Sequence, residues 1–228
     1  MRFIILAVIF ILLPFFSANS ACIFNCQKSD LVASADGPTM FSKDFENTVF
    51  SEDFENTDQR DLRVDDRNNK WHIKQDNDGN SIYCNEVTDE WSAFNFGSEH
   101  WSDYSISYRM KFSAGKGGEL ETHIRKTNSD YRASVNNLTG SAYIEFTKSS
   151  GFYESIARGI ASTKAEDEWS EIQLIASGNN IQYLVDGKVV ASTNDDRVKK
   201  GAAMIAASAN LEICIDNIVV KKETAKDL

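Results

Sequence analysis

Polar side chains able to bind or transform a ligand are concentrated between Glu119 and Arg125. Glu121, His123 and Arg125 are separated by one residue each, and apolar residues or threonine alternate with them. Because neighbouring residues of a β-strand point to opposite faces, this spacing predicts that the three polar side chains share one face of a sheet. Such a set of carboxylate, imidazole and guanidinium groups can bind sugar hydroxyl groups or carry acid–base chemistry.

A second alternating segment, Tyr104 to Ser113, has Arg109 on its polar side. We expect this strand to lie beside the first one, with Arg109 on the same face as Glu121. Tyr131 follows downstream and would add an aromatic platform for a sugar ring. The alternative is a solvated sheet face, on which Glu121 and Arg125 form an ion pair worth less than about 1 kcal/mol.

Sets of residues typical of catalysis are missing. Retaining glycoside hydrolysis uses two carboxyl groups about 5–5.5 Å apart, which an E-x-D-x-E run on one strand would supply. The chain has no such run, because Glu119 and Glu121 form an i, i+2 pair without a third acid. Its three histidines, His72, His100 and His123, show neither zinc-site spacing nor a Ser-His-Asp pattern.

The elements that position these residues are short strands. The stretch from Trp169 to Ala191 predicts three strands joined at Ser177–Asn180 and at Asp186–Gly187. The Asp-Gly pair is a strong hairpin signal because a type I′ turn needs positive φ at both central residues. From Trp71 onward similar strands alternate with turn-forming residues, and no long amphipathic helix is predicted. We therefore expect an all-β, two-sheet antiparallel sandwich.

The ends of the chain have a different character. Arg2, the apolar run Phe3–Phe16 and the small or polar residues 17–21 predict a secretory signal peptide over residues 1–21. Residues 22–49 are expected to form a flexible leader that contains the first copy of a short repeat. In that repeat Phe41–Thr48 recurs as Phe50–Thr57. The sandwich should occupy residues 50–222, followed by a polar tail at 223–228.

The charge of the chain restricts its partners. The formal net charge is -10, so binding to nucleic acid or to anionic membranes is not expected. No apolar run after the signal peptide is long enough to cross a bilayer. These features predict a secreted or periplasmic/extracellular protein.

Four cysteines, Cys22, Cys26, Cys84 and Cys214, permit three disulfide pairings, and an exported protein favours disulfides. We favour Cys22 with Cys26 and Cys84 with Cys214, because the first two lie close together in the leader. The sequon Asn137-Leu138-Thr139 would be glycosylated only in a eukaryotic secretory pathway.

The order of several motifs resembles a known fold family. The motifs are Phe50-Ser-Glu-Asp-Phe-Glu, Trp71-His-Ile, Trp101-Ser-Asp-Tyr, Arg125 with Tyr131, Trp169, Gly178-Asn-Asn-Ile, Val185-Asp-Gly and Ile215-Asp-Asn-Ile-Val-Val. Together they resemble the concanavalin A-like jelly roll, in its laminin-G-like and 3-keto-disaccharide-hydrolase-like branch. The resemblance covers about residues 50–222, and it includes both lectins and enzymes, so fold does not fix function.

The resemblance implies a concave sheet that presents a groove, with Arg125 on that sheet. It also implies that the first and last strands are adjacent, which would bring Asp53 or Glu55 near Asp216. Related sandwiches often hold one structural calcium there, and oxygen ligands of this kind suit calcium. A cap of the terminal strand by Asp216 and its neighbouring Asn217 is the alternative.

We therefore predict a secreted, non-catalytic domain that binds an extracellular glycan or polysaccharide. The expected ligand-binding residues are Arg109, Glu121, His123, Arg125 and Tyr131. Two alternatives remain open. One is a sugar-active hydrolase of the 3-keto-disaccharide-hydrolase-like type, with Glu121 or His123 as acid or base, and the other is a laminin-G-like adhesion domain.

Overall fold

Two antiparallel β-sheets make up the part of the chain that the computed structural model describes, residues 47–55, 64–66 and 69–224. The all-β sandwich predicted from the sequence is confirmed. The expected signal peptide, the leader up to residue 46, and Cys22 with Cys26 lie outside the described residues. No helix in the described ranges is long and apolar enough to span a membrane.

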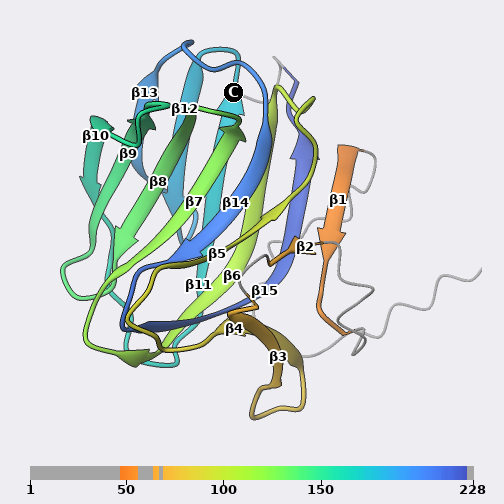
Figure 1. Cartoon of the computed structure of the whole chain (residues 1–228), viewed down its shortest axis with the longest axis vertical. Helices are drawn as coiled ribbons and strands as arrows, with labels where there is room; N and C mark the ends of the chain where they lie inside the picture. Colours follow the sequence, from red (N-terminus) through yellow and green to blue (C-terminus); the bar gives the residue numbers. More distant parts are fainter. Residues whose placement is uncertain (1–46, 56–63, 67–68, 225–228) are drawn as a thin grey trace, which may run out of the picture. The chain divides into compact units, whose positions relative to one another are not determined.

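We call the eight-stranded layer sheet A and the seven-stranded layer sheet B (Figure 1). Sheet A has the order β13 (Lys188–Asn194), β12 (Asn180–Val185), β11 (Ser170–Ser177), β6 (Tyr104–Gly115), β15 (Leu211–Lys222), β4 (Ser81–Asn85) and β3 (Trp71–Gln75), and β1 (Thr48–Glu52) also pairs with β15. Sheet B has the order β10 (Tyr153–Ile160), β9 (Ser141–Thr147), β8 (Asp130–Asn136), β7 (Glu119–Lys126), β14 (Ala202–Ala207), β5 (Ser92–Phe96) and β2 (Val64–Asp65).

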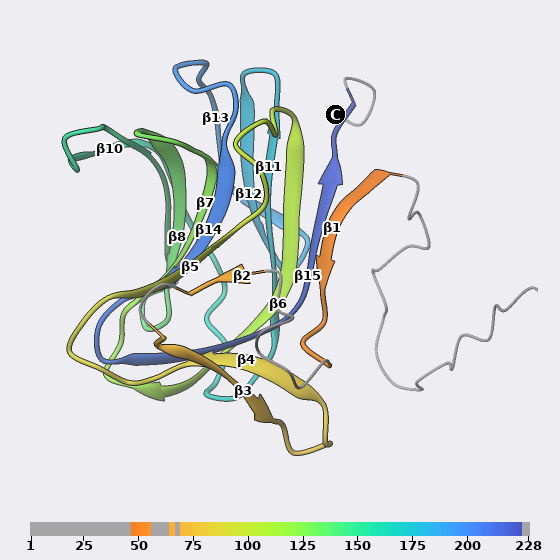
Figure 2. The same cartoon turned by 45° about the vertical axis from the view of Figure 1, so that its right-hand side comes forward.

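The core fills the space between the two sheets, as the alternating strand patterns require. In Figure 2, β7, β8 and β14 lie on one side, and β6, β11 and β15 lie on the other. Leu120 and Ile124 of sheet B and Ile106 of sheet A are fully buried in one apolar cluster. The hydroxyl groups of Tyr108 and Thr122, one from each sheet, are 2.6 Å apart in this core. The even-numbered residues of β7 from Leu120 to Ile124 therefore face inward.

The predicted meander is present as β11, β12 and β13. Its second turn has φ of 50° at Asp186 and 72° at Gly187, as a type I′ turn requires. The first and last strands of the domain, β1 and β15, pair as the family resemblance implied.

Two strand assignments from the sequence need correction. Residues 92–96, for which the sequence pattern predicts no separate strand, form strand β5 and pair with β14. The strand that carries Arg109 is β6, and it belongs to sheet A instead of lying beside β7. Alternation identifies the polar side of a strand but not its neighbours, because consecutive strands can alternate between the two sheets of a sandwich.

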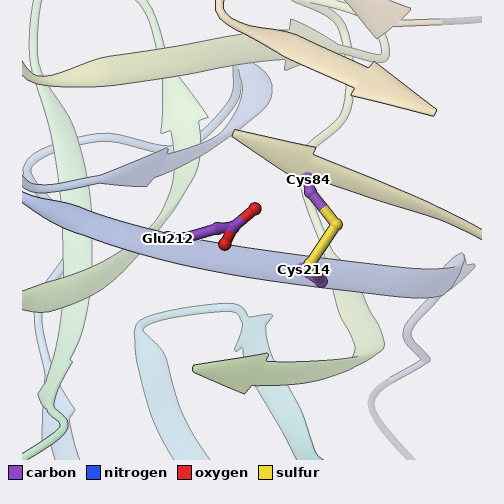
Figure 3. Close-up of side chains that lie close together, drawn as sticks. All are labelled: Cys84, Glu212 and Cys214. Carbon is purple, nitrogen blue, oxygen red and sulfur yellow. A yellow bond between two sulfur atoms is a disulfide. The ribbon is translucent and has the colours of Figure 1, made fainter. Parts of the chain in front are cut away.

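A disulfide connects two adjacent strands of sheet A. Cys84 of β4 and Cys214 of β15 are directly opposite each other and are bonded, which confirms the favoured pairing of these two residues. Figure 3 shows the Glu212 carboxylate beside this bond. Cys84, Glu212 and Cys214 are the only set of potential metal ligands close enough to share an ion among the described residues. With both sulfur atoms in a disulfide, this set serves as a cross-link and an ion-pair partner for Lys74.

Removal of this cross-link should lower stability strongly, because the bond closes a chain segment with a sequence separation of 130. The double variant Cys84→Ala/Cys214→Ala should lose about 3–5 kcal/mol of unfolding free energy, from the greater freedom of the unfolded chain. Urea unfolding of the variant and of the oxidised and reduced wild type measures the effect. Equal stability of oxidised and reduced wild-type protein would contradict this role.

Candidate functional site

Strand β7 presents Glu121 and His123 on the outer face of sheet B, away from sheet A. Their neighbour Thr122 points inward to Tyr108, so the alternation of the strand sends the two polar side chains outward. The sequence prediction that these two residues share a face agrees with the structure. Both are nevertheless buried, since polar side chains from β7, β8 and β9 pack closely over this face.

A row of charged residues crosses the outer face perpendicular to the strands. His123 of β7 lies opposite Arg132 of β8, and Arg132 lies opposite Glu145 of β9. The Arg132 Nη1 atom donates to Glu121 Oε1 at 2.9 Å, and its Nε atom donates to Glu145 Oε2 at 2.8 Å. The Arg132 Nη2 atom also pairs with Glu145. Two carboxylates thus fix the plane of one guanidinium group.

An aromatic ring extends this row toward the edge of the sheet. The Arg132 guanidinium carbon lies 3.9 Å from the ring centre of Tyr153 on β10. The Tyr153 residue is 53% exposed, so part of it remains open to solvent. A planar cation stacked on an exposed aromatic side chain provides hydrogen-bond donors and an apolar surface side by side.

On its other side His123 lies between two carboxylates. Its Nδ1 atom is 3.1 Å from Asp130 Oδ2, and its Nε2 atom is 3.2 Å from Glu121 Oε2. Lys126 donates to the same oxygen of Asp130 at 3.4 Å. We use the name outer-face cluster for these connected residues, Glu121, His123, Lys126, Asp130, Arg132, Glu145 and Tyr153.

An apolar floor adjoins the outer-face cluster. Met204 and Ala206 of β14 are opposite His123 and Glu121, and together with Ala93 of β5 they form a small separate apolar group. Trp91 precedes β5, is 43% exposed and hydrogen-bonds the Glu121 carboxylate. The cluster is therefore bordered by one exposed aromatic side chain in β10 and another before β5.

The carboxyl groups on this face differ in acidity. Burial would raise the pKa of the Glu121 carboxyl, but hydrogen bonding from His123 and the positive charge of Arg132 outweigh burial and lower it. For Glu119, burial together with the negative charges of Glu121 and Glu145 exceeds the opposing effect of Arg132 and raises the pKa. Glu121 is thus held as a carboxylate, whereas Glu119 takes up a proton more easily than an ordinary glutamate.

Arg125 does not share the face of Glu121 and His123. The pairing of β7 with β14 shifts register between Ala202 and Met204, and Arg125 itself has a φ of 52°. This bulge redirects the side chain, which is 1% exposed, toward loops at the end of the sandwich. Its guanidinium donates to the backbone oxygens of Ser102, Val198 and Gly178 and to the carboxylate of Asp103.

Two other expected ligand-binding residues are also placed elsewhere. The Tyr131 ring lies in the core, and its hydroxyl donates to Asp195 at 2.6 Å and accepts from the Val198 backbone N–H. Arg109 lies on sheet A, where it pairs with Asp216 and lies over Trp169. Neither side chain reaches the outer-face cluster, because one points into the core and the other belongs to the opposite sheet.

The three residues expected to bind calcium have separate hydrogen-bond partners, and among the described residues their carboxylates do not form a set close enough to share an ion. Asp216 Oδ2 accepts hydrogen bonds from Asn80, Asn217 and Arg109, and Glu55 Oε1 accepts from the Ser81 backbone N–H. Asp53 instead accepts from the Glu55 backbone N–H. Because the Arg109 guanidinium already neutralises Asp216, this donor set does not fit a calcium ion.

Sequence reasoning did not identify Arg132, Glu145 or Asp130 as site residues. A usable signal was present, because Arg132 and Glu145 are polar positions in strands whose alternate residues are apolar. Short loops between β7, β8 and β9 favour a meander of adjacent antiparallel strands. With the strands aligned in that order, both residues fall on the face of Glu121 and His123.

Comparison with solved structures identifies the architecture. A carbohydrate-binding module, CBM66, from Bacillus subtilis matches with a TM-score of 0.58 and 14% identity over 71% of this chain and 96% of the module. A family GH16 protein of Bacteroides ovatus in complex with a G4G4G3G product matches with a TM-score of 0.55 and 10% identity over 75% of this chain and 99% of that protein. The exoplasmic/lumenal domain of VIP36 in its Ca²⁺/Man3GlcNAc-bound form matches with a TM-score of 0.51 and 9% identity over 73% of this chain and 90% of that domain.

The chain has the concanavalin A-like jelly-roll fold. At these identities the likeness establishes the fold alone. No family model matches this concanavalin A-like chain, and no curated protein matches it.

The contacts of Arg125 predict a structural role for this residue. Arg125→Met should lose about 3 kcal/mol or more of unfolding free energy, since several buried backbone oxygens would lose their donors. Arg132→Met, on the outer face, is the matched control and should lose less. Chemical unfolding of both variants tests this difference, and an Arg125→Met variant as stable as Arg132→Met would contradict it.

Proposed function

We propose that this domain binds a saccharide on the outer face of sheet B, across strands β7 to β10. The observation that carries the proposal is the position of the Arg132 guanidinium, fixed by Glu121 and Glu145 and stacked on the half-exposed Tyr153. Sugar rings offer hydroxyl groups at their edges and C–H groups on their faces. Such ligands suit carboxylates and a guanidinium beside an aromatic ring.

The hydrogen-bonding capacity of the cluster supports this ligand class. Arg132 has five N–H groups, and three of its N–H···O contacts go to Glu121 and Glu145. Among the described residues, one N–H on each terminal nitrogen of Arg132 has no further partner. These two N–H groups would donate to sugar oxygens, and the second lone pairs of the carboxylates would accept from sugar hydroxyl groups.

The carbohydrate-binding proteins among the structural neighbours favour the same proposal, although they establish only the fold. The Cys84–Cys214 disulfide fits an oxidising compartment, in line with a secreted protein. Calcium is not part of the proposed binding, because Arg109 already neutralises Asp216. A loss of affinity in EDTA would contradict this point.

A second candidate is hydrolysis of a sugar substrate. The observation in its favour is that Glu119 and Glu121 lie two residues apart on β7, on one face of the strand, and that their pKa values are shifted in opposite directions, as in acid–base pairs of glycosidases. Release of reducing ends from mixed-linkage β-glucan or laminarin, or turnover of 3-keto-glucosides, would establish this function if the Glu121→Gln variant lost the activity.

An adhesion role is the other alternative. It would be indicated by a protein partner in the absence of any glycan signal.

Substitutions on the two sheets test the binding proposal. Arg132→Ala and Tyr153→Ala should each weaken saccharide binding about tenfold or more, because they remove the guanidinium and its aromatic support. Arg109→Ala, which alters a stacked arginine on sheet A, is the matched control and should bind as the wild type does.

The binding measurement uses a glycan array followed by affinity electrophoresis with laminarin and mixed-linkage β-glucan. Binding that survives Arg132→Ala but is lost in Arg109→Ala would place the site on sheet A. Absence of binding to every glycan on the array would contradict the proposed function.

A further inference from the structure

The His123 ring needs two protons in its present position. Its two nitrogens face Asp130 Oδ2 at 3.1 Å and Glu121 Oε2 at 3.2 Å, and all three side chains are buried. A carboxylate oxygen can only accept hydrogen bonds, so each ring nitrogen has to donate. Only the imidazolium ion carries a proton on both nitrogens. A neutral ring would direct a lone pair at one of the two carboxylates.

The groups around His123 give the same requirement in terms of charge. β7 contributes Glu121, β8 contributes Asp130 and Arg132, and β14 contributes the uncharged Met204 opposite the ring. Lys126 reaches Asp130, and Glu145 of β9 reaches Arg132. With a protonated His123 the outer-face cluster has three cations and three anions. Loss of that proton leaves one buried negative charge without a counter-ion, and Glu119 adds a further acid nearby.

Electrostatics favour the charged ring. Burial alone would lower the pKa of His123, but the hydrogen bonds to Asp130 and Glu121 and their negative charges raise it above the ordinary value. Because the pKa of His123 is higher in the folded than in the unfolded state, its contribution to stability is complete when the pH is below the unfolded-state pKa. That contribution is lost as the pH rises through the folded-state pKa.

We propose that protonation of His123 controls saccharide binding at the outer face of sheet B. The imidazolium holds Glu121 through one oxygen, and the other oxygen of Glu121 holds Arg132, which stacks on Tyr153. Loss of the Nε2 proton removes the donor that holds Glu121, so one of the two carboxylates that fix the guanidinium is no longer held in place and Glu145 alone orients Arg132. His123 is a positioning residue in this scheme, and the inference rests on the proposed function.

The chain offers a simple test because it has three histidines, His72, His100 and His123. Proton NMR of histidine-labelled protein should show one imidazole, absent in His123→Gln, that titrates above the ordinary value. Laminarin and mixed-linkage β-glucan affinity, measured from pH 5 to 9, should fall about tenfold or more around the same midpoint. His72→Gln, the matched control, should keep this pH profile of affinity, whereas the affinity of His123→Gln should not change with pH.

Separate readouts distinguish failure of the inference from failure of the proposed function. Saccharide binding that is independent of pH in the wild type, or equally pH-dependent in His123→Gln, would overturn the inference alone. If no saccharide binds, the proposed function fails, but the Arg132 Nε–H signal still reports the free protein. A shift of this signal at the His123 midpoint would support the coupling of His123 to Arg132, and no shift would overturn it.

Discussion

The backbone bulge at Arg125 determines which side chains of β7 lie on the outer face of sheet B and which support the fold. Up to His123 the strand alternates regularly, so Glu121 and His123 point away from sheet A. At the bulge one extra residue opposes β14, and the positive φ of Arg125 turns its side chain toward the end of the sandwich. The Tyr104 hydroxyl accepts a hydrogen bond from the Arg125 backbone N–H at 2.7 Å and stabilises this conformation.

The same constraint explains the surroundings of the bulge. A Cβ atom on Gly201 would lie 2.2 Å from the Arg125 carbonyl carbon, so the neighbouring strand can approach only because it has glycine there. The buried guanidinium then joins three loops through their backbone oxygens. One arginine of the β7–β8 region thus stabilises the end of the sandwich. Arg132, at a regular position of β8, remains on the outer face with its charge paired by Glu121 and Glu145.

Much of the fold follows from the sequence because strand alternation and turn chemistry are local properties. The Asp186-Gly187 turn and the alternation in β6, β7 and β12 all depend on residues within a few positions of each other. Assignment of β6 and β7 to different sheets depends on packing between distant segments, and the alternation of polar and apolar residues does not predict which sheet a strand joins. Consequently Glu121 and His123 were placed together correctly, whereas Arg109 was expected on the wrong sheet. The bulge at Arg125 was equally invisible, because an arginine at positive φ has no distinctive sequence pattern.

The account depends most on the location of the saccharide site, and an NMR titration tests it directly. Laminarin or mixed-linkage β-glucan would be added to ¹⁵N-labelled protein at a pH below the midpoint of the His123 titration. The chemical shifts of the backbone amides and of the arginine side chains would then be followed. The account predicts that the largest changes occur in β7, β8, β9 and β10, with the Arg132 Nε–H among them. Changes confined to sheet A, or to the loops around Arg125, would contradict it.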